Sequence, residues 1–338
     1  MPDLDSLSIL FIWTAIAIYA AAFVAYAFDL ARRSEVSADA RLVRERDAML
    51  VGAGAPAAGS GAPSGADAAD AASDPAASDL QKRPRYVMAR IGTALTVLGF
   101  LFQLAATITR GIAAERVPWA NLYEFAMTGT LLVVFVYLLV NTRIDLRFLG
   151  TFITGLVVIL MGAAAISFYV GIVPLMDPLK SVWLVIHVFV ASLGTAFFAL
   201  ACALSVLQLM QSRRERKIVE AAEKQGPRFL ATLPDADRLE GMAFRFAIVG
   251  FIFWTFTLIA GAIWAQDAWG RYWGFDVKET WTFIIWVLYA GYLHARATRG
   301  WRGNPSAWLS IVGFTAVIFN FTIVNVFFKG LHAYSGLS

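Results

Sequence analysis

Eight apolar stretches dominate this sequence, and each is about as long as a helix that crosses a lipid bilayer. They cover residues 7–28, 90–110, 122–140, 148–170, 183–210, 243–264, 280–295 and 306–327. With 59% hydrophobic and only 15% charged residues, the chain leaves almost no room for a soluble domain. The sequence therefore predicts an all-α, polytopic membrane protein with about eight transmembrane helices.

The chain before the second apolar stretch divides into two parts. Residues 1–28 are expected to form the first transmembrane helix, because the run lacks the basic leader of a signal peptide and is too long for one. Residues 29–89 begin with charges and continue as a tract rich in Ala, Gly, Ser, Pro and Asp, which has almost nothing to bury. We expect a disordered cytoplasmic linker there, followed by a seven-helix core over residues 90–338.

The basic residues indicate the orientation of these helices. Most of the 28 lysines and arginines fall in the connections after the first, third, fifth and seventh expected helices. Those on the opposite side are Arg110, Arg116, Lys180, Arg271, Lys278 and Lys329. The positive-inside rule therefore places both termini outside the cell and the basic connections in the cytoplasm, as expected for a multi-pass plasma-membrane protein. The charge bias suits membrane lipid and implies no nucleic-acid partner.

Residues 264–281, WAQDAWGRYWGFDVKETW, join the sixth and seventh expected helices on the outer side and hold four of the 11 tryptophans. Tryptophan and tyrosine present large rigid faces, and Gly270 and Gly274 leave the backbone open to a ligand. The segment is therefore expected to be a loop that holds something flat and apolar. The alternative is an interfacial aromatic belt that anchors the helix ends.

Histidines are the candidate metal ligands in this sequence. Its one cysteine, Cys202, falls in the middle of an apolar stretch, and no Cys-x-x-Cys pair exists for thiol redox chemistry or covalent haem attachment. His187 at the start of the fifth helix and His332 after the eighth are expected at the outer face, level with the tryptophan segment. Two neutral imidazoles beside aromatic faces suit axial ligation of haem iron and stacking on its porphyrin.

Charged residues of the same segment fit this interpretation. Arg271 or Lys278 can pair with the propionates of a haem. Asp276 and Glu279 can hold a ligand histidine in the right tautomer.

The third histidine, His294, is expected at the cytoplasmic end of the seventh helix, beside basic residues. It is either a contact to lipid headgroups or a ligand of a second, inner haem site. No fourth histidine exists to complete such a site, so the second interpretation requires a ligand from a partner subunit.

At this point the sequence resembles a known family. The order W-A-x-x-A-W-G-R-Y-W-G-F-D-V-K-E-T, with a histidine before it and G-L-H-x-Y after it, resembles the WWD-domain haem-handling proteins, in particular the CcsA/ResC subunit of the system II cytochrome c synthetase. The resemblance covers residues 90–336. It implies that haem b binds the tryptophan-rich segment at the outer face with His187 and His332 as its axial ligands. The haem-binding aromatic residues would be Trp264, Trp269, Trp273 and Phe275.

Partners follow from the same resemblance. His294 would pair with a histidine of a ResB-type membrane subunit as haem crosses the bilayer. Apocytochrome c would be the protein substrate, and a thiol-reducing, thioredoxin-like protein is a further expected partner. The family usually reads W-G-W-D-P-K-E, so Phe275 and Val277 are departures from it.

The segment PWANLYE matches a second pattern of the family, P-x-x-N-x-Y-E. From the residues alone, Pro118, Asn121 and Glu124 are expected to form a turn and a helix cap. The resemblance adds a functional role for both.

The sequence thus predicts a membrane subunit that delivers haem outward and presents it to the Cys-x-x-Cys-His motif of apocytochrome c, where thioether bonds form. No nucleophile or acid–base pair is evident, so whether the chain itself is an enzyme is partly a matter of definition. Two other functions remain open: a b-haem electron-transfer protein, and a secondary transporter or lipid-modifying enzyme that uses Asp276 and Glu279 on a non-haem substrate.

Overall fold

The computed structural model describes residues 3–53, 87–175, 177–219, 228–298, 301–328 and 330–332, and the described chain is helical without strands. The α-helices are α1 (Leu4–Ala53), α3 (Val87–Ala114), α4 (Leu122–Asn141), α5 (Gly150–Ser167), α6 (Val182–Val219), α7 (Ala236–Trp269), α8 (Val277–Ala297), α9 (Asn304–Phe321) and α10 (Ile323–Phe327). Short 3₁₀ helices lie between them, at η1 (Arg147–Leu149), η2 (Asp177–Lys180) and η3 (Arg228–Thr232).

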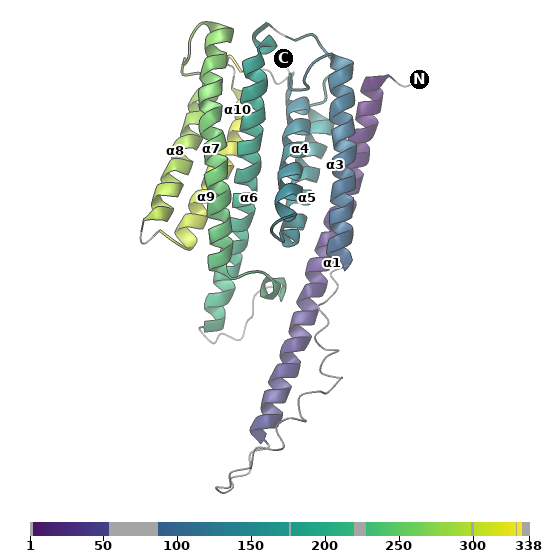
Figure 1. The fold of residues 1–338 in the computed structure, drawn as a ribbon, viewed down its shortest axis with the longest axis vertical. Coiled ribbons are helices and arrows are strands. Elements are labelled where there is room, and N and C mark those ends of the chain that lie inside the picture. The colour runs from purple at the N-terminus through teal and green to yellow at the C-terminus, as the bar shows by residue number, and fades with distance from the viewer. Residues whose placement is uncertain are drawn as a thin grey trace.

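The long helices run up and down in a single bundle (Figure 1). The start of α1, the α7–α8 connection and the short helix α10 all lie at the upper end in that view. This end of the bundle is called the loop end below. An alternating path of this kind brings segments that are far apart in sequence to one end, as the sequence analysis expected for His187, His332 and the tryptophan segment.

Two groups of helices make up the bundle (Figure 1). In one group, α1 packs along α3 and α5, and α4 packs on α5. In the other, α6 packs along α7 and α9, and α8 packs on α9. The two groups meet mainly where α4 lies against α6. The largest cluster of buried side chains extends from this junction into the second group, where Phe198 of α6 stacks on Tyr289 of α8 with ring centroids 3.5 Å apart.

Seven of the described helical segments are long and apolar enough to cross a membrane. They are Leu4–Arg32, Val87–Ala114, Leu122–Asn141, Arg147–Ser167, Val182–Lys217, Ala236–Trp269 and Asn304–Phe327. The remaining expected span, 280–295, is the seventh in chain order and forms α8, which has 21 residues but is less apolar because tryptophan, tyrosine, threonine and histidine interrupt its aliphatic run. The all-helical, multi-pass architecture is confirmed. α8 packs beside the spans in the same bundle.

Helix α1 is longer than the sequence indicated. It continues past the apolar run to Ala53, so residues 29–53 of the expected linker are helical. The charged residues from Arg32 to Asp47 include good helix formers, which allow the helix to continue beyond its membrane segment. The low-complexity part of the linker falls within 54–86, outside the described residues, and its disorder stays a prediction.

Close contacts between helices depend on glycines, which face either a large ring or the backbone of the neighbouring helix. The buried Tyr19 of α1 lies over Gly99 of α3, where an added Cβ would come within 2.8 Å of the ring. Gly194 of α6 lies against Gly250 of α7, and an added Cβ there would be 3.3 Å from the Gly250 carbonyl oxygen. Within a lipid bilayer no hydrophobic effect drives helices together, so they associate through close packing of this kind.

Candidate functional site

The tryptophan segment is mostly helical. Residues 264–269 are the last turns of α7, residues 277–281 open α8, and the connection between the two helices is 270–276. Gly270 ends α7 in the left-handed conformation with φ 70°, which glycine adopts at little cost. Asp276 starts α8 through a capping box in which its side chain and that of Glu279 accept backbone N–H groups. The expected loop over 264–281 is therefore shorter than predicted, because both helices carry strong capping residues.

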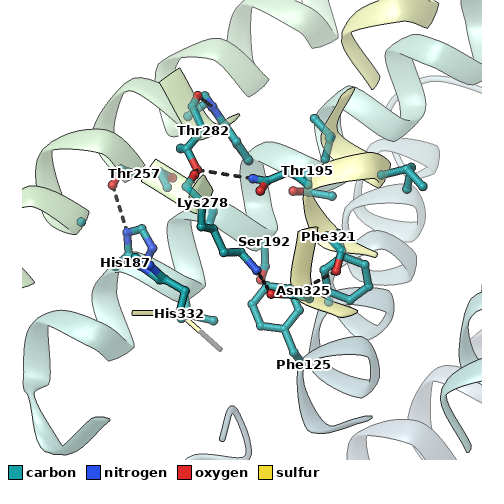
Figure 2. A pocket seen from close by; sticks show the side chains of 18 of the residues that line it. Phe125, His187, Ser192, Thr195, Thr257, Lys278, Thr282, Phe321, Asn325 and His332 are labelled. Atoms are coloured by element: carbon teal, nitrogen blue, oxygen red, sulfur yellow. Dashed lines mark hydrogen bonds between the residues drawn. The ribbon is translucent and has the colours of Figure 1, made fainter. Parts of the chain in front are cut away.

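His187 and His332 come together at the loop end. His187 lies in the second turn of α6, and His332 follows α10, yet both line the same two cavities. Nδ1 of His187 lies 3.0 Å from the carbonyl oxygen of Thr257 in α7. Nδ1 of His332 lies 2.8 Å from Oδ2 of Asp276. Figure 2 shows both histidines at the larger cavity, with the bond from His187 to Thr257 drawn.

These two contacts fix the tautomer of each ring. A carbonyl oxygen and a carboxylate oxygen can only accept hydrogen bonds, so Nδ1 must carry the hydrogen in both histidines. In the neutral imidazole the lone pair is then on Nε2, the nitrogen that binds a metal when Nδ1 is engaged in this way. The two imidazoles therefore present the same atom for ligation.

Asp276 holds His332 through a network rather than a single bond. Its Oδ1 accepts the N–H of Leu331 at 2.9 Å, and its Oδ2 also accepts the N–H of Lys278 at 3.3 Å. The hydrogen bond from His332, followed by those from the backbone, lowers the pKa of the Asp276 carboxyl to about 2 although partial burial opposes this. The group is therefore a carboxylate at neutral pH, and it can only accept from His332.

Two tryptophans pack directly against the histidines. Trp264 is 2% exposed and stacks on His187 with ring centroids 5.8 Å apart. Its ring also meets the edge of His332 at 5.4 Å, and Trp269 meets His332 at 4.9 Å. The structure thus brings four of the predicted haem-site residues into one cluster of rings.

Trp273, Phe275 and Arg271 are placed differently from one another. Trp273 lines the larger cavity. Phe275 is 80% exposed, has a φ of 57°, and lines neither cavity. The guanidinium of Arg271 lies over Gly274, where an added Cβ would come within 0.7 Å of Nη1, and Arg271 lines neither cavity. Of these three, the structure brings only Trp273 to the histidines.

His294 lies far from this cluster. It is an exposed residue in the last turn of α8, at the other end of the helix from Lys278. The two residues are sixteen positions apart, which at 1.5 Å per residue corresponds to roughly 24 Å. The structure therefore separates His294 from the other two histidines, as the sequence analysis expected.

Asn121 and Glu124 both have structural roles. Asn121 caps α4, where its Oδ1 accepts the N–H of Glu124 at 2.9 Å, and it also borders the smaller cavity. Glu124 is fully buried and lines neither cavity. It accepts from Arg110 at 3.0 Å and from Arg116 at 2.7 Å. The cap expected from the residues alone is present, and Glu124 adds a buried ion cluster to it.

Two cavities adjoin the histidines at the junction of the helix groups. The larger, about 190 Å³, has walls from α4 to α10, and the smaller measures about 100 Å³. Both are bordered by His187, His332, Lys278 and Asn325. Most of the larger wall is apolar, with residues such as Leu156, Val188 and Phe321. A concave, mostly apolar site with a few converging polar groups is the usual form of a small-molecule site.

Asn325 and Thr257 belong to the site but were not predicted as site residues from the sequence. Lys278 Nζ donates to Asn325 Oδ1, which joins α8 to α10 on the cavity wall. An asparagine in an otherwise apolar helix is a signal that could have identified Asn325. Thr257 acts through its backbone carbonyl, which any residue would supply, so no sequence signal marks it.

Together the fold and the site define a polytopic membrane protein that holds two histidines, tryptophans and a mostly apolar cavity at one end of its bundle. The sequence family described as Cytochrome C assembly protein matches residues 119–332, a range that contains every element of this cluster. The chain belongs to that family.

Individual relatives agree with this assignment. The cytochrome c biogenesis protein CcsA of Synechococcus elongatus is 33% identical over 72% of this chain and 87% of its own length. CcsA of Guillardia theta is 31% identical over 73% of this chain and 86% of its own. CcsA of Heterosigma akashiwo is 32% identical over 65% of this chain and 77% of its own. The chain is thus a membrane subunit of cytochrome c maturation, a process that joins haem to apocytochrome c.

A solved structure of the cytochrome c heme lyase CcmF has a similar fold. It superposes with a TM-score of 0.58 and 17% sequence identity, over 95% of this chain. This chain spans about half of that protein, 47% of its length. At this identity the likeness concerns the fold alone.

Proposed function

We propose that this subunit binds haem b at the loop end with Nε2 of His187 and of His332 as axial ligands, and presents it there to apocytochrome c. Haem is a substrate in this proposal. The observation that carries it is the matched pair of imidazoles, each with Nδ1 bonded to an acceptor and Nε2 left for iron, beside a mostly apolar cavity. Both features fit a porphyrin whose iron takes two histidines.

The chemistry at the site is the addition of two cysteine thiols of a Cys-x-x-Cys-His motif to the two vinyl groups. Each S–H adds across a C=C bond, so a C–S bond and a C–H bond form and no external oxidant or reductant is consumed. The protein contributes orientation and exclusion of water, through the Trp264 and Trp269 rings and the apolar cavity wall. The loop end faces outward from the plasma membrane in this proposal, as the basic connections at the opposite end support.

His294 would serve haem at the other end of the bundle. Its exposure at the end of α8 leaves it accessible to a ligand from a ResB-type partner subunit. A thioredoxin-like protein would keep the apocytochrome thiols reduced.

The test is an absorption spectrum of the full chain purified with its co-expressed partner. The wild type is expected to show a low-spin haem spectrum, and His187→Gly and His332→Gly are expected to lose it and to recover it when imidazole is added. Imidazole fills the space of the missing side chain and supplies the same ligand atom. A variant that folds but keeps the wild-type spectrum without imidazole would remove that histidine from the site. A wild-type protein that binds no haem would reject the proposal.

A further inference from the structure

The wall shared by the two cavities carries a basic side chain. In the described part of the chain, Lys278 is the one lysine or arginine that lines either cavity. Figure 2 shows its side chain running from α8 to Asn325, with the two histidines on one side and Phe125 and Phe321 on the other. An ammonium group in such apolar surroundings is costly unless an acceptor or an anion compensates it.

The acceptor found on this wall pairs with only one of the hydrogen-bond donors of the Lys278 amino group. Nζ has three N–H donors, and the acceptor that the described residues give it is Oδ1 of Asn325. Asn325 is held in turn, because its Nδ2 donates to the carbonyl oxygen of Phe321 at 2.6 Å. The lysine is therefore positioned by a neutral amide, and it retains donors for a further acceptor.

Other buried polar atoms line the larger cavity without a partner. They include Oγ of Ser192, in a residue 3% exposed, and Oδ1 of Asn320, in a residue 6% exposed. The amide of Asn320 reaches Thr282 Oγ1 at 3.4 Å, on the helix that carries Lys278. Buried polar groups are almost always hydrogen-bonded, so these unpartnered atoms indicate a polar ligand. Of the two, the Ser192 hydroxyl can donate to an anion, whereas Oδ1 of Asn320 only accepts.

The charges that face Lys278 allow an anionic ligand. Glu279 also borders the cavity. Its Oε2 accepts the N–H groups of Gly274 and Asp276 at 2.8 and 3.1 Å, which holds the carboxylate at the connection, and its Oε1 is buried without a partner. Asp276 accepts from His332 and two backbone N–H groups. His187, His332 and Tyr272 are the other titratable groups on the wall.

We propose that Lys278, positioned by Asn325, and the hydroxyl of Ser192 form a carboxylate subsite for the propionate groups of haem. This inference rests on the proposed function and deepens it. The propionates of haem lie on one edge of the ring and the vinyl groups on the opposite side. Propionates anchored at Lys278 point into the bundle, so the vinyl groups point to the open loop end where thiols arrive. Lys278 thus sets the direction in which haem is presented, and Arg271 over Gly274 does not.

The test compares haem with haem dimethyl ester, which has the same iron and ring but no carboxylates. Both are titrated into the full-length, detergent-solubilised protein purified from haem-deficient cells, and the Soret band is followed. The wild type is expected to bind haem roughly tenfold to a hundredfold more tightly than the ester, the range for one charge-assisted hydrogen bond. In Lys278→Met this preference is expected to fall to about twofold or less because the ester's affinity stays unchanged while that of haem drops.

Matched variants complete the design. Lys278→Arg is expected to keep the preference for haem, since it retains the charge. Lys180→Met removes an exposed lysine of η2 that pairs with Asp177, and it is expected to behave as the wild type. Unchanged ester binding by Lys278→Met shows that the variant is folded.

Three results would overturn the subsite. They are a wild type that does not distinguish haem from its ester, a Lys278→Met variant that keeps the wild-type preference, and an Arg271→Met variant that abolishes it. In each case a spectrum that still depends on His187 and His332 leaves the proposed function standing. If neither compound gives such a spectrum, the proposed function itself fails.

Discussion

Two polar clusters lie at the loop end of this bundle, and they differ in how completely their groups are paired. The first cluster surrounds Glu124, whose two oxygens accept from Arg110, Arg116 and the N–H of Ala120. Arg110 also pairs with Asp5 and donates to the carbonyl oxygen of Val170 at 2.7 Å. This cluster joins α1, α3 and α4 and lines neither cavity.

The second cluster, around His187 and His332, is incomplete. Both imidazoles are held at Nδ1 only, and the wall beside them has unpartnered atoms on Ser192, Glu279 and Asn320. Burying the polar groups of either cluster in an apolar bundle would cost free energy unless hydrogen bonds or opposite charges compensated them. In the first cluster both carboxylate oxygens are paired, and the one unpartnered atom of its described ion pairs, Nε of Arg116, faces no cavity. The comparison teaches that the cluster closed around its carboxylate stabilises the fold, while the one whose unpartnered atoms line a cavity is arranged for a ligand.

The largest expected effect tests the paired cluster. Glu124→Gln leaves Arg110 and Arg116 buried beside a neutral amide, and we expect it to destabilise the protein by about 3–5 kcal/mol. The measurement is thermal unfolding of the purified protein in detergent. Asp177→Asn, which breaks the exposed pair with Lys180, serves as the control and should change stability by less than about 0.5 kcal/mol. Equal melting temperatures for both variants would remove the distinction between the clusters.

A smaller effect is expected in the incomplete cluster. Asp276→Asn can present an N–H to Nδ1 of His332, which favours the tautomer with hydrogen on Nε2 and blocks iron. We expect haem affinity to fall roughly tenfold to a hundredfold, as for other groups that orient a ligand histidine. The fall would be measured by haem titration. Asp235→Asn is the matched control, because Asp235 caps α7 in the same way, with its side chain 2.7 Å from the N–H of Arg238. The same loss in both variants would attribute the effect to capping.

The position of His187 can be tested through its neighbour on α7. A Cβ at Gly261 would lie 2.8 Å from Nδ1 and Cε1 of His187, so Gly261→Ala must displace the imidazole. We expect haem affinity to fall roughly tenfold, since a small displacement of a ligand atom is costly. Gly162→Ala, where nothing lies within 4 Å of the added Cβ, is the control. Unchanged titration curves for Gly261→Ala would show that iron is not held at this ring.

The smallest effect concerns Phe275, which holds a left-handed backbone conformation with φ 57°. Phe275→Gly relieves this strain, and we expect a stability gain of about 1 kcal/mol or less. Haem affinity should change by no more than about twofold, because the ring is 80% exposed and lines neither cavity. Thermal unfolding and haem titration measure the two quantities. A large loss of haem affinity would place the ring against the ligand.

Sequence reasoning identified the helices and the end at which the site residues meet, because both depend on length and alternation. It could not distinguish Arg271 from Lys278, since the direction of a side chain depends on the turn it occupies. Gly274 leaves space for the Arg271 guanidinium, whereas the first turn of α8 directs Lys278 to Asn325. It also could not foresee that Trp264 is buried between the histidines rather than displayed on a loop, because the end of α7 is set by Gly270.

The attachment of His332 has a kinetic consequence. His187 belongs to the 38-residue helix α6, so its backbone cannot move without disturbing the bundle. His332 lies beyond the five-residue helix α10. A single carboxylate, that of Asp276, accepts hydrogen bonds both from its ring and from the N–H of Leu331. In the proposed function, loss of the hydrogen bond from His332 to Asp276 frees one ligand position of the haem iron, while His187 keeps the other. The incoming histidine of apocytochrome c would then replace His332 rather than His187. The finished cytochrome would leave from the side of the haem that His332 had occupied.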